Sequence, residues 1–232
     1  MTSKAYELKN AYIGEYGWKP WSNTVAYYPL TATTTVNDQS GNSRNLTNTN
    51  VTFWTNQWVS CASFNWTDSK LNYSSFYNLS QWDYAINLRA YKLTQTQNDA
   101  YIVDMWTHSS SYKGQSLVVE YDNNRLRFAF WYDDCDASVN PSNQWTNICC
   151  QYKKSTNEQF LYVNWVLNNS RTATNTHLLQ NLNLCICGNV ISTSQINYCW
   201  KWYLSNLIFE NKLWTATEVQ NYYNKTKSNY WF

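Results

Sequence analysis

Short stretches in which apolar and polar residues alternate run along most of the chain, and many of their residues are β-branched or aromatic. This period of two is typical of half-buried β-strands, and turns rich in Asn, Ser and Thr separate the stretches. Ten strands are expected, at residues 24–30, 61–66, 84–91, 100–105, 116–121, 125–132, 147–153, 159–165, 182–188 and 203–210. Because Asn and Asp tolerate positive φ, residues 122–124 predict a tight hairpin between two of them. The pattern predicts an all-β fold, an antiparallel two-sheet jelly-roll sandwich.

One short helix is expected near the C-terminus. Thr215 and Glu218 have the spacing of a capping box, in which each side chain binds a backbone N–H at the start of a helix. Trp214 and Val219 are placed to form a hydrophobic staple across the same turn. The helix is expected to run over residues 216–223 and to close the domain.

The composition fits one domain with a neutral, polar surface. A length of 232 residues suits one β-sandwich, since such domains commonly reach about 200–250 residues. Hydrophobic residues make up 44% of the chain, but charged residues only 14%, compared with about 25% in average soluble domains. Residues 24–232 are expected to form the sandwich, and residues 1–23 a leader or attachment segment.

Charge and hydropathy argue against two classes of partner. The net charge is +2 and the basic residues are scattered, so the chain has no basic patch for a nucleic-acid backbone. No stretch approaches the roughly 18 apolar residues of a membrane span, and residues 1–10 lack the apolar region of a signal peptide. The seven cysteines are odd in number and lack CxxC spacing, which favours buried free thiols over disulfides or zinc.

Several ordered motifs carry a family resemblance. They are Val-Ala-Tyr-Tyr-Pro-Leu at 25–30, Asn-Asp-Gln-Ser-Gly-Asn at 37–42, Cys-Ala-Ser-Phe-Asn at 61–65, Gln-Trp-Thr-Asn-Ile-Cys at 144–149, Phe-Leu-Tyr-Val-Asn at 160–164 and Leu-Ser-Asn-Leu-Ile-Phe at 204–209. Over residues 24–224 the chain resembles the laminin-G-like group of the concanavalin A-like lectin/glucanase superfamily. The resemblance implies the same sandwich fold and a binding function, with glycans as the first candidate ligand.

The chain departs from that family where the family has glycine. Tryptophan stands there at Trp58, Trp66, Trp165 and Trp202, and the chain holds 14 Trp but only 5 Gly. The position after Asn164 should adopt positive φ, which a bulky side chain resists. We interpret these tryptophans as TGA codons that the source organism reads as glycine, which would point to a bacterium with a recoded stop codon or its phage.

The sequence lacks a catalytic motif. Glucanases of the resembled superfamily use an E-x-D-x-x-E strand, which places two carboxylates on one face, and this chain has none. Only His108 and His177 are available as imidazole bases, and no nucleophile elbow, HExxH motif or phosphate loop occurs. The chain is therefore expected to be a binding protein; a glycoside hydrolase is the least supported alternative.

Calcium is a candidate cofactor, although none is required by the fold. Many members of the resembled superfamily bind it, and hard oxygen ligands suit it. Asp38 with Asn42 forms one candidate site, and Asp133, Asp134 and Asp136 form another. The alternatives are an Asx-turn at Asp38 and a solvated loop at the second cluster.

Sugar sites combine an exposed aromatic face with hydrogen-bonding polar groups. Two predicted strand ends have this chemistry, and the alternative for each aromatic residue is a place in the core. The candidate glycan ligands are Asp104, Trp106, His108, Trp131 and Tyr132. Carbohydrate recognition is the expected function. The alternative is a phage tail or capsid-decoration protein that contacts other virion proteins through residues 1–23.

Overall fold

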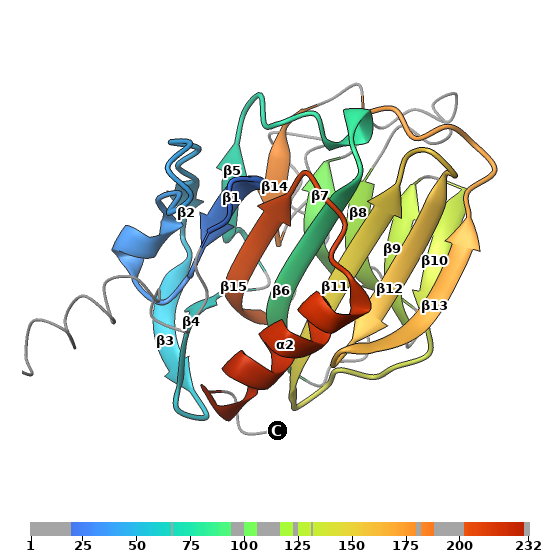
Figure 1. The fold of residues 1–232 in the computed structure, drawn as a ribbon. Helices are drawn as coiled ribbons and strands as arrows, with labels where there is room; N and C mark the ends of the chain where they lie inside the picture. The colour runs from blue at the N-terminus through green and yellow to red at the C-terminus, as the bar shows by residue number, and fades with distance from the viewer. Residues whose placement is uncertain are drawn as a thin grey trace, which may run out of the picture.

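The computed structural model of the chain describes residues 20–65, 67–93, 100–105, 117–122, 125–130, 132–179, 182–187 and 202–229. Two antiparallel sheets pack face to face, and one α-helix covers the outer face of one sheet (Figure 1). The predicted all-β sandwich with one short C-terminal helix is confirmed. The predicted leader, residues 1–23, lies outside the described residues except for its last four, so virion attachment stays a prediction.

The first sheet, sheet A, has eight strands in the order β13-β12-β11-β6-β15-β4-β3, with β1 pairing beside β15. All its pairings are antiparallel. Its strands are β1 (Thr24–Tyr28), β3 (Thr52–Asn56), β4 (Val59–Ser63), β6 (Tyr84–Lys92), β11 (Trp145–Lys153), β12 (Glu158–Val163), β13 (Val166–Thr172) and β15 (Trp202–Glu210).

The second sheet, sheet B, has seven strands in the order β10-β9-β8-β7-β14-β5-β2. They are β2 (Thr47–Thr49), β5 (Lys70–Tyr73), β7 (Ala100–Met105), β8 (Leu117–Asp122), β9 (Arg125–Phe130), β10 (Asp133–Ala137) and β14 (Leu184–Ile186). Three short 3-10 helices, η1 (Thr33–Val36), η2 (Leu79–Gln81) and η3 (Lys227–Asn229), and helix α2 (Ala216–Thr226) complete the described elements.

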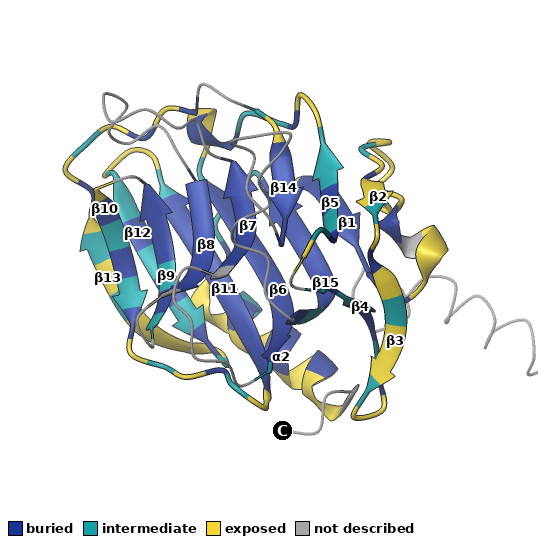
Figure 2. Ribbon diagram, turned by 180° about the vertical axis from the view of Figure 1, so that it is seen from behind, coloured by how far each residue is buried: buried dark blue, intermediate teal, exposed yellow. Residues whose placement is uncertain are grey.

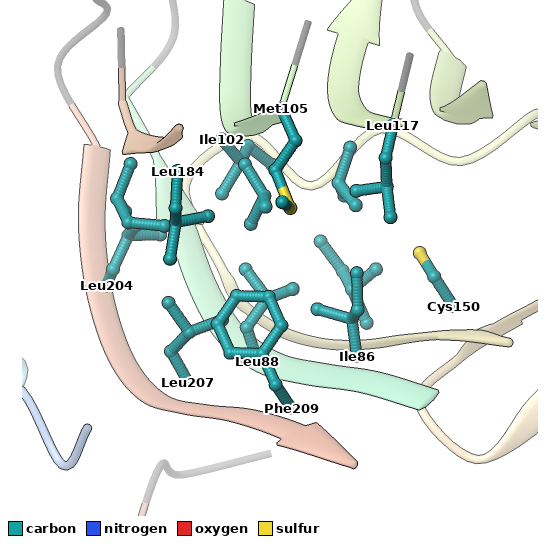
Figure 3. Packing of buried hydrophobic residues seen from close by; sticks show 14 of the residues in the cluster. Ile86, Leu88, Ile102, Met105, Leu117, Cys150, Leu184, Leu204, Leu207 and Phe209 are labelled. Carbon is teal, nitrogen blue, oxygen red and sulfur yellow. The ribbon is translucent and has the colours of Figure 1, made fainter. Parts of the chain in front are cut away.

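The main core fills the space between the two sheets. Side chains of β6 and β15 in sheet A meet those of β7, β8 and β14 in sheet B (Figure 3). Ile86 and Leu88 project from the centre of sheet A toward Ile102 and Met105. The central strands are accordingly buried, while β3 at one edge is largely exposed (Figure 2).

Strand β6 is buried along its whole length because sheet A is covered on both faces. On the outer face, Ala85 joins a second cluster with Trp214, Val219 and Tyr222, which belong to helix α2 and the segment before it. Arg89, also fully buried on β6, donates a hydrogen bond to the Thr226 hydroxyl of the helix. The helix therefore provides both apolar contacts and a polar partner for the covered face.

Helix α2 begins as its sequence predicts. Thr215 accepts a hydrogen bond from the Glu218 backbone N–H, and the Glu218 carboxylate accepts one from the Thr215 N–H. Trp214 and Val219 lie in the same apolar cluster, as a hydrophobic staple requires. The capping box is confirmed, and the helix extends to Thr226, three residues beyond the predicted end.

All ten predicted strands are present, with shifted ends, and β8 and β9 form the predicted hairpin through the pair Asp122–Arg125. Five further strands were not predicted: β2, β3, β5, β10 and β13. Polar residues dominate most of them, as in β2 and β13, because these strands lie at or near sheet edges and bury little apolar surface. A pattern search for apolar alternation therefore misses them.

Six of the seven cysteines lie in the described residues, and all six are free and buried, as predicted. Burial raises the pKa of the Cys61, Cys135 and Cys149 thiols to about 12. Cys199 lies outside the described residues. None of the described helices is both long and apolar enough to span a membrane.

The capping box gives a test of how far helix α2 stabilises the fold. Thr215→Ala removes the cap hydroxyl and is expected to lower the free energy of unfolding by about 1 kcal/mol, measured by urea denaturation. Thr217→Ala, at an exposed position within the first turn, is the matched control and should not destabilise the protein. Equal losses in the two variants would contradict a capping role.

Candidate functional site

An open pocket of about 570 Å³ lies at the β3 edge of sheet A. Three parts of the chain line it: the segment from the end of β1 into η1, strand β3 and the start of β4. The lining residues are Thr31, Ala32, Thr33, Phe53, Trp54, Thr55 and Ser60. We call this the Trp54 pocket.

Trp54 is an exposed aromatic residue among those that line this pocket, with 65% of its area accessible to solvent. Successive side chains of a strand point to opposite faces, and its neighbour Phe53 packs against the main core. Strand β3 is the last strand of sheet A, so within the described residues its second edge pairs with no other strand. The indole therefore lies where a ligand in solution can reach it.

The chemistry of the lining suits a sugar. An exposed indole offers a flat apolar face for the C–H groups of a pyranose or furanose ring. Four of the lining residues, Thr31, Thr33, Thr55 and Ser60, carry hydroxyl groups, a type of group that can both donate to and accept from sugar hydroxyls. Among the described residues that line the pocket, none has an acidic, basic or imidazole side chain. These lining residues offer neutral polar groups.

The hairpin that carries Trp54 is held to the rest of sheet A. The Trp145 indole N–H donates to the Asn56 carbonyl at 3.4 Å, and the Gln57 amide donates to the Tyr91 hydroxyl at 3.4 Å. Tyr91 and Trp145 belong to an apolar cluster that includes Val59 of β4. These contacts fix the position of the pocket wall before a ligand arrives.

Of the five predicted glycan ligands, two lie in the described residues, Asp104 and Tyr132. Asp104 is fully buried in β7, paired with Cys185 on one side and Val118 on the other, and its role as a glycan ligand stays a prediction. Tyr132 is 62% exposed in the loop between β9 and β10. The predicted ligands Trp106, His108 and Trp131 lie outside the described residues.

The cluster Asp133, Asp134 and Asp136 lies in strand β10 and not in a solvated loop. Buried residues alternate with half-buried ones along this segment, and Cys135 and Ala137 are among the buried ones. The segment pairs with β9 as an antiparallel strand. Asp136 accepts from Arg127 and forms an ion pair with Arg125. Asp134 and Asp136 thus lie beside arginines on the outer side of sheet B, whereas Asp133 is on the same face of β10 as the buried Cys135.

Asp133 is the most enclosed member, with no accessible side-chain area. Its carboxylate accepts from the Thr174 backbone at 2.7 Å, from the Asn175 backbone at 2.9 Å and amide at 2.7 Å, and from Arg171 at 2.9 Å. Burial raises the pKa of Asp133, but these hydrogen bonds and the Arg171 charge outweigh it and hold the pKa below its usual value. The carboxylate fastens the segment after β13 to sheet B.

Asp38 and Asn42 organise a turn. Asp38 accepts from the backbone N–H groups of Tyr27, Ser40 and Arg44, which is the expected Asx-turn alternative with added contacts. Asn42 donates its amide to the carbonyl oxygens of β1. Among the described residues no group of three or more His, Cys, Asp or Glu side chains is placed to hold a metal ion, and calcium binding stays a prediction.

Glu210 has the raised pKa of a potential general acid, but not the position of one. Burial raises its pKa to about 7, while hydrogen bonds from Trp214 and Thr24 act in the opposite direction. The side chain is fully buried at the end of β15 and lies outside the lining of the Trp54 pocket. Its hydrogen bonds join β1, β15 and the start of α2, which is a structural role.

No protein-family model matches the sequence, and no curated protein is similar enough to match. Solved structures do resemble the fold. The binding domain of Paraclostridial Mosquitocidal Protein 1 superposes with a TM-score of 0.68 at 16% identity, over 87% of this chain and 52% of that one. Domain 4 of an extracellular GH43 arabinanase from Geobacillus stearothermophilus, in complex with arabinotriose, gives 0.65 at 14% identity, over 86% and 98%.

A structure of botulinum neurotoxin type C, whose cell entry depends on interaction with two ganglioside molecules, gives a TM-score of 0.66 at 12% identity, over 88% of this chain and 51% of that one. The chain thus spans about half the length of the matched toxin structures and nearly all of the arabinanase domain. At these identities the likeness establishes the fold, a β-sandwich of the kind found in binding domains.

Asp133 is expected to serve stability. Asp133→Ala leaves Arg171 and three N–H donors without their acceptor and should lower the free energy of unfolding by about 3 kcal/mol in urea denaturation. Asp134→Ala, whose side chain is 37% exposed, should cost less than about 1 kcal/mol. Calcium or EDTA should leave the parent midpoint unchanged. A calcium-dependent rise that Asp133→Ala abolishes would show instead that this carboxylate binds the ion.

Glu210 is expected to make the protein less stable as pH rises. Its pKa moves from 4.5 in the unfolded chain to about 7 in the fold, so between these values the folded state binds the extra proton. The free energy of unfolding should therefore fall by about 3 kcal/mol from pH ~4.5 to above pH ~7. Glu210→Gln should remove this decline, and Glu158→Gln, at a partly exposed position, should retain it. An unchanged pH profile in Glu210→Gln would refute the assignment.

Proposed function

We propose that this chain is a non-catalytic carbohydrate-binding module and that the Trp54 pocket is its sugar site. The observation that carries the proposal is one open pocket whose lining includes four hydroxyl-bearing residues and Trp54, an exposed aromatic residue of β3. Aromatic stacking supplies apolar contact with a sugar ring, and the hydroxyls supply hydrogen bonds that orient it.

Two further observations support binding over catalysis. None of the described residues that line the pocket is titratable, and retaining or inverting glycoside hydrolysis needs two carboxyl groups beside the scissile bond. Structures with the same fold include an arabinanase domain holding arabinotriose and a toxin whose cell entry depends on gangliosides. These precedents name the first two ligand classes to test.

The proposal is tested with a glycan array, followed by calorimetric titration of arabinotriose, a ganglioside oligosaccharide and the strongest array ligand. Trp54→Ala is expected to weaken binding about tenfold or more, because about 1.4 kcal/mol of stacking corresponds to that factor. Trp54→Phe should retain most of the affinity. Trp82→Ala removes another exposed indole, 50% accessible and outside the pocket lining, and should leave binding unchanged.

Strand β3 offers a second matched pair. Thr55→Val removes a lining hydroxyl while keeping the branched shape, and should weaken binding severalfold if that hydroxyl bonds the sugar. Thr52→Val makes the same change on the same strand outside the pocket lining and should have no effect. Absence of any glycan binding by the parent, or equal affinity in Trp54→Ala and the parent, would refute the proposal.

A further inference from the structure

Two hairpins of sheet A have loops with nearly the same backbone. Between β3 and β4, Asn56 pairs with Val59, and the loop residues Gln57 and Trp58 have φ of 48° and 69°. Between β12 and β13 the loop residues Asn164 and Trp165 have φ of 48° and 70°. In both loops the second of two residues, in the left-handed region, is tryptophan.

A two-residue loop with positive φ at both positions has the signature of a type I′ turn, whose preferred sequence is Asn-Gly. Any side chain with a Cβ atom is disfavoured at positive φ, and only glycine, Asn and Asp adopt it readily. Asn164 fits the first position, and its side chain accepts from the Asn147 backbone at 2.9 Å. Tryptophan does not fit the second.

Neither tryptophan is buried. Trp58 is 85% exposed, the most exposed of the large hydrophobic residues in the described part of the chain, and Trp165 is 42% exposed. The only glycine among the described residues, Gly41, has φ of +92° and thus occupies a position that requires it. Thirteen other described residues also have positive φ, and at the second position of these two hairpin loops the residue is the bulkiest side chain, in a chain with 14 Trp and 5 Gly.

We propose that the natural protein has glycine at positions 58 and 165, because the gene has TGA codons there that its source reads as glycine. TGA is a stop codon that some genetic codes assign to tryptophan and others to glycine. Translation of such a gene with the first assignment places tryptophan at every such glycine. The exposed indoles of Trp58 and Trp165 are then absent from the natural surface.

The inference does not extend to the tryptophans that lack positive φ. Trp145 and Trp214 are buried, have ordinary φ, and donate from their indole N–H groups to Asn56 and Glu210. Trp202 is buried in the main core without positive φ, although its indole N–H has no hydrogen-bond partner among the described residues. Trp66 lies outside the described residues. The backbone argument therefore applies to positions 58 and 165.

The direct test is to sequence the gene and to measure peptide masses of the natural protein. TGA codons are expected at positions 58 and 165, with TGG at 145 and 214. Peptides from the protein isolated from its native source, analysed by mass spectrometry, should be lighter by the difference between an indolylmethyl group and a hydrogen atom. A TGG codon, or a peptide of tryptophan mass, at either position would overturn the proposal.

A second test uses the chain as given. Trp58→Gly and Trp165→Gly should each raise the folded-to-unfolded equilibrium constant about fivefold in urea denaturation, because relief of left-handed strain exceeds the added freedom of the unfolded chain. Trp82→Gly is the matched control: Trp82 is also exposed but has φ of −134°, so the change should not stabilise the protein. Loss of stability in either hairpin variant would count against the inference.

The same gene sequence separates this inference from the proposed function. Trp54 lies in an extended strand, where tryptophan is favoured, and its φ is not positive. A TGG codon at position 54 retains the indole of the Trp54 pocket. A TGA codon there would remove the proposed sugar platform from the natural protein while leaving the argument for positions 58 and 165 intact.

Discussion

The burial of sheet A on both faces is the constraint on which the rest of the structure depends. Sheet B covers one face and helix α2 the other, so strand β6 has no solvent-exposed residue. Polar side chains on the covered outer face need partners, since a buried group without one is costly. Arg89 reaches the helix at Thr226, and the Asn147 amide donates to Asn87 at 2.9 Å. The capped helix is therefore a third layer of the core.

This arrangement leaves the edge of the sandwich as the place for recognition. Helix α2 crosses the middle of sheet A, and strand β3 lies beyond it at the edge (Figure 1). The segment after β1 returns beside β3 and forms the other wall of the Trp54 pocket. An aromatic side chain can stay exposed there without loss of core packing, because its neighbour Phe53 supplies the apolar contact.

Apolar alternation made the central strands and the two-sheet class predictable, and the capping box located the helix. The edge strands β2, β3 and β13 were missed because most of their side chains face water. Asp133 was expected in a loop. The sequence did contain a signal for a strand, because Cys135 and Ala137 are apolar residues two positions apart, which is the period of a half-buried strand. Trp54 was not predicted as a site residue, because the pocket forms only when the segment Thr31–Thr33, more than 20 residues away in sequence, lies beside β3. Two aromatic residues flanked by threonines were the only local hint.

The buried thiols have a consequence for the conditions in which the fold can persist. The thiolate is the form that forms disulfides and reacts with oxidants, and desolvation in the core suppresses it. The six described cysteines are free, shielded from solvent and spread over both sheets. The packing that these six provide therefore requires neither an oxidising nor a reducing environment, and a change of redox potential leaves it intact.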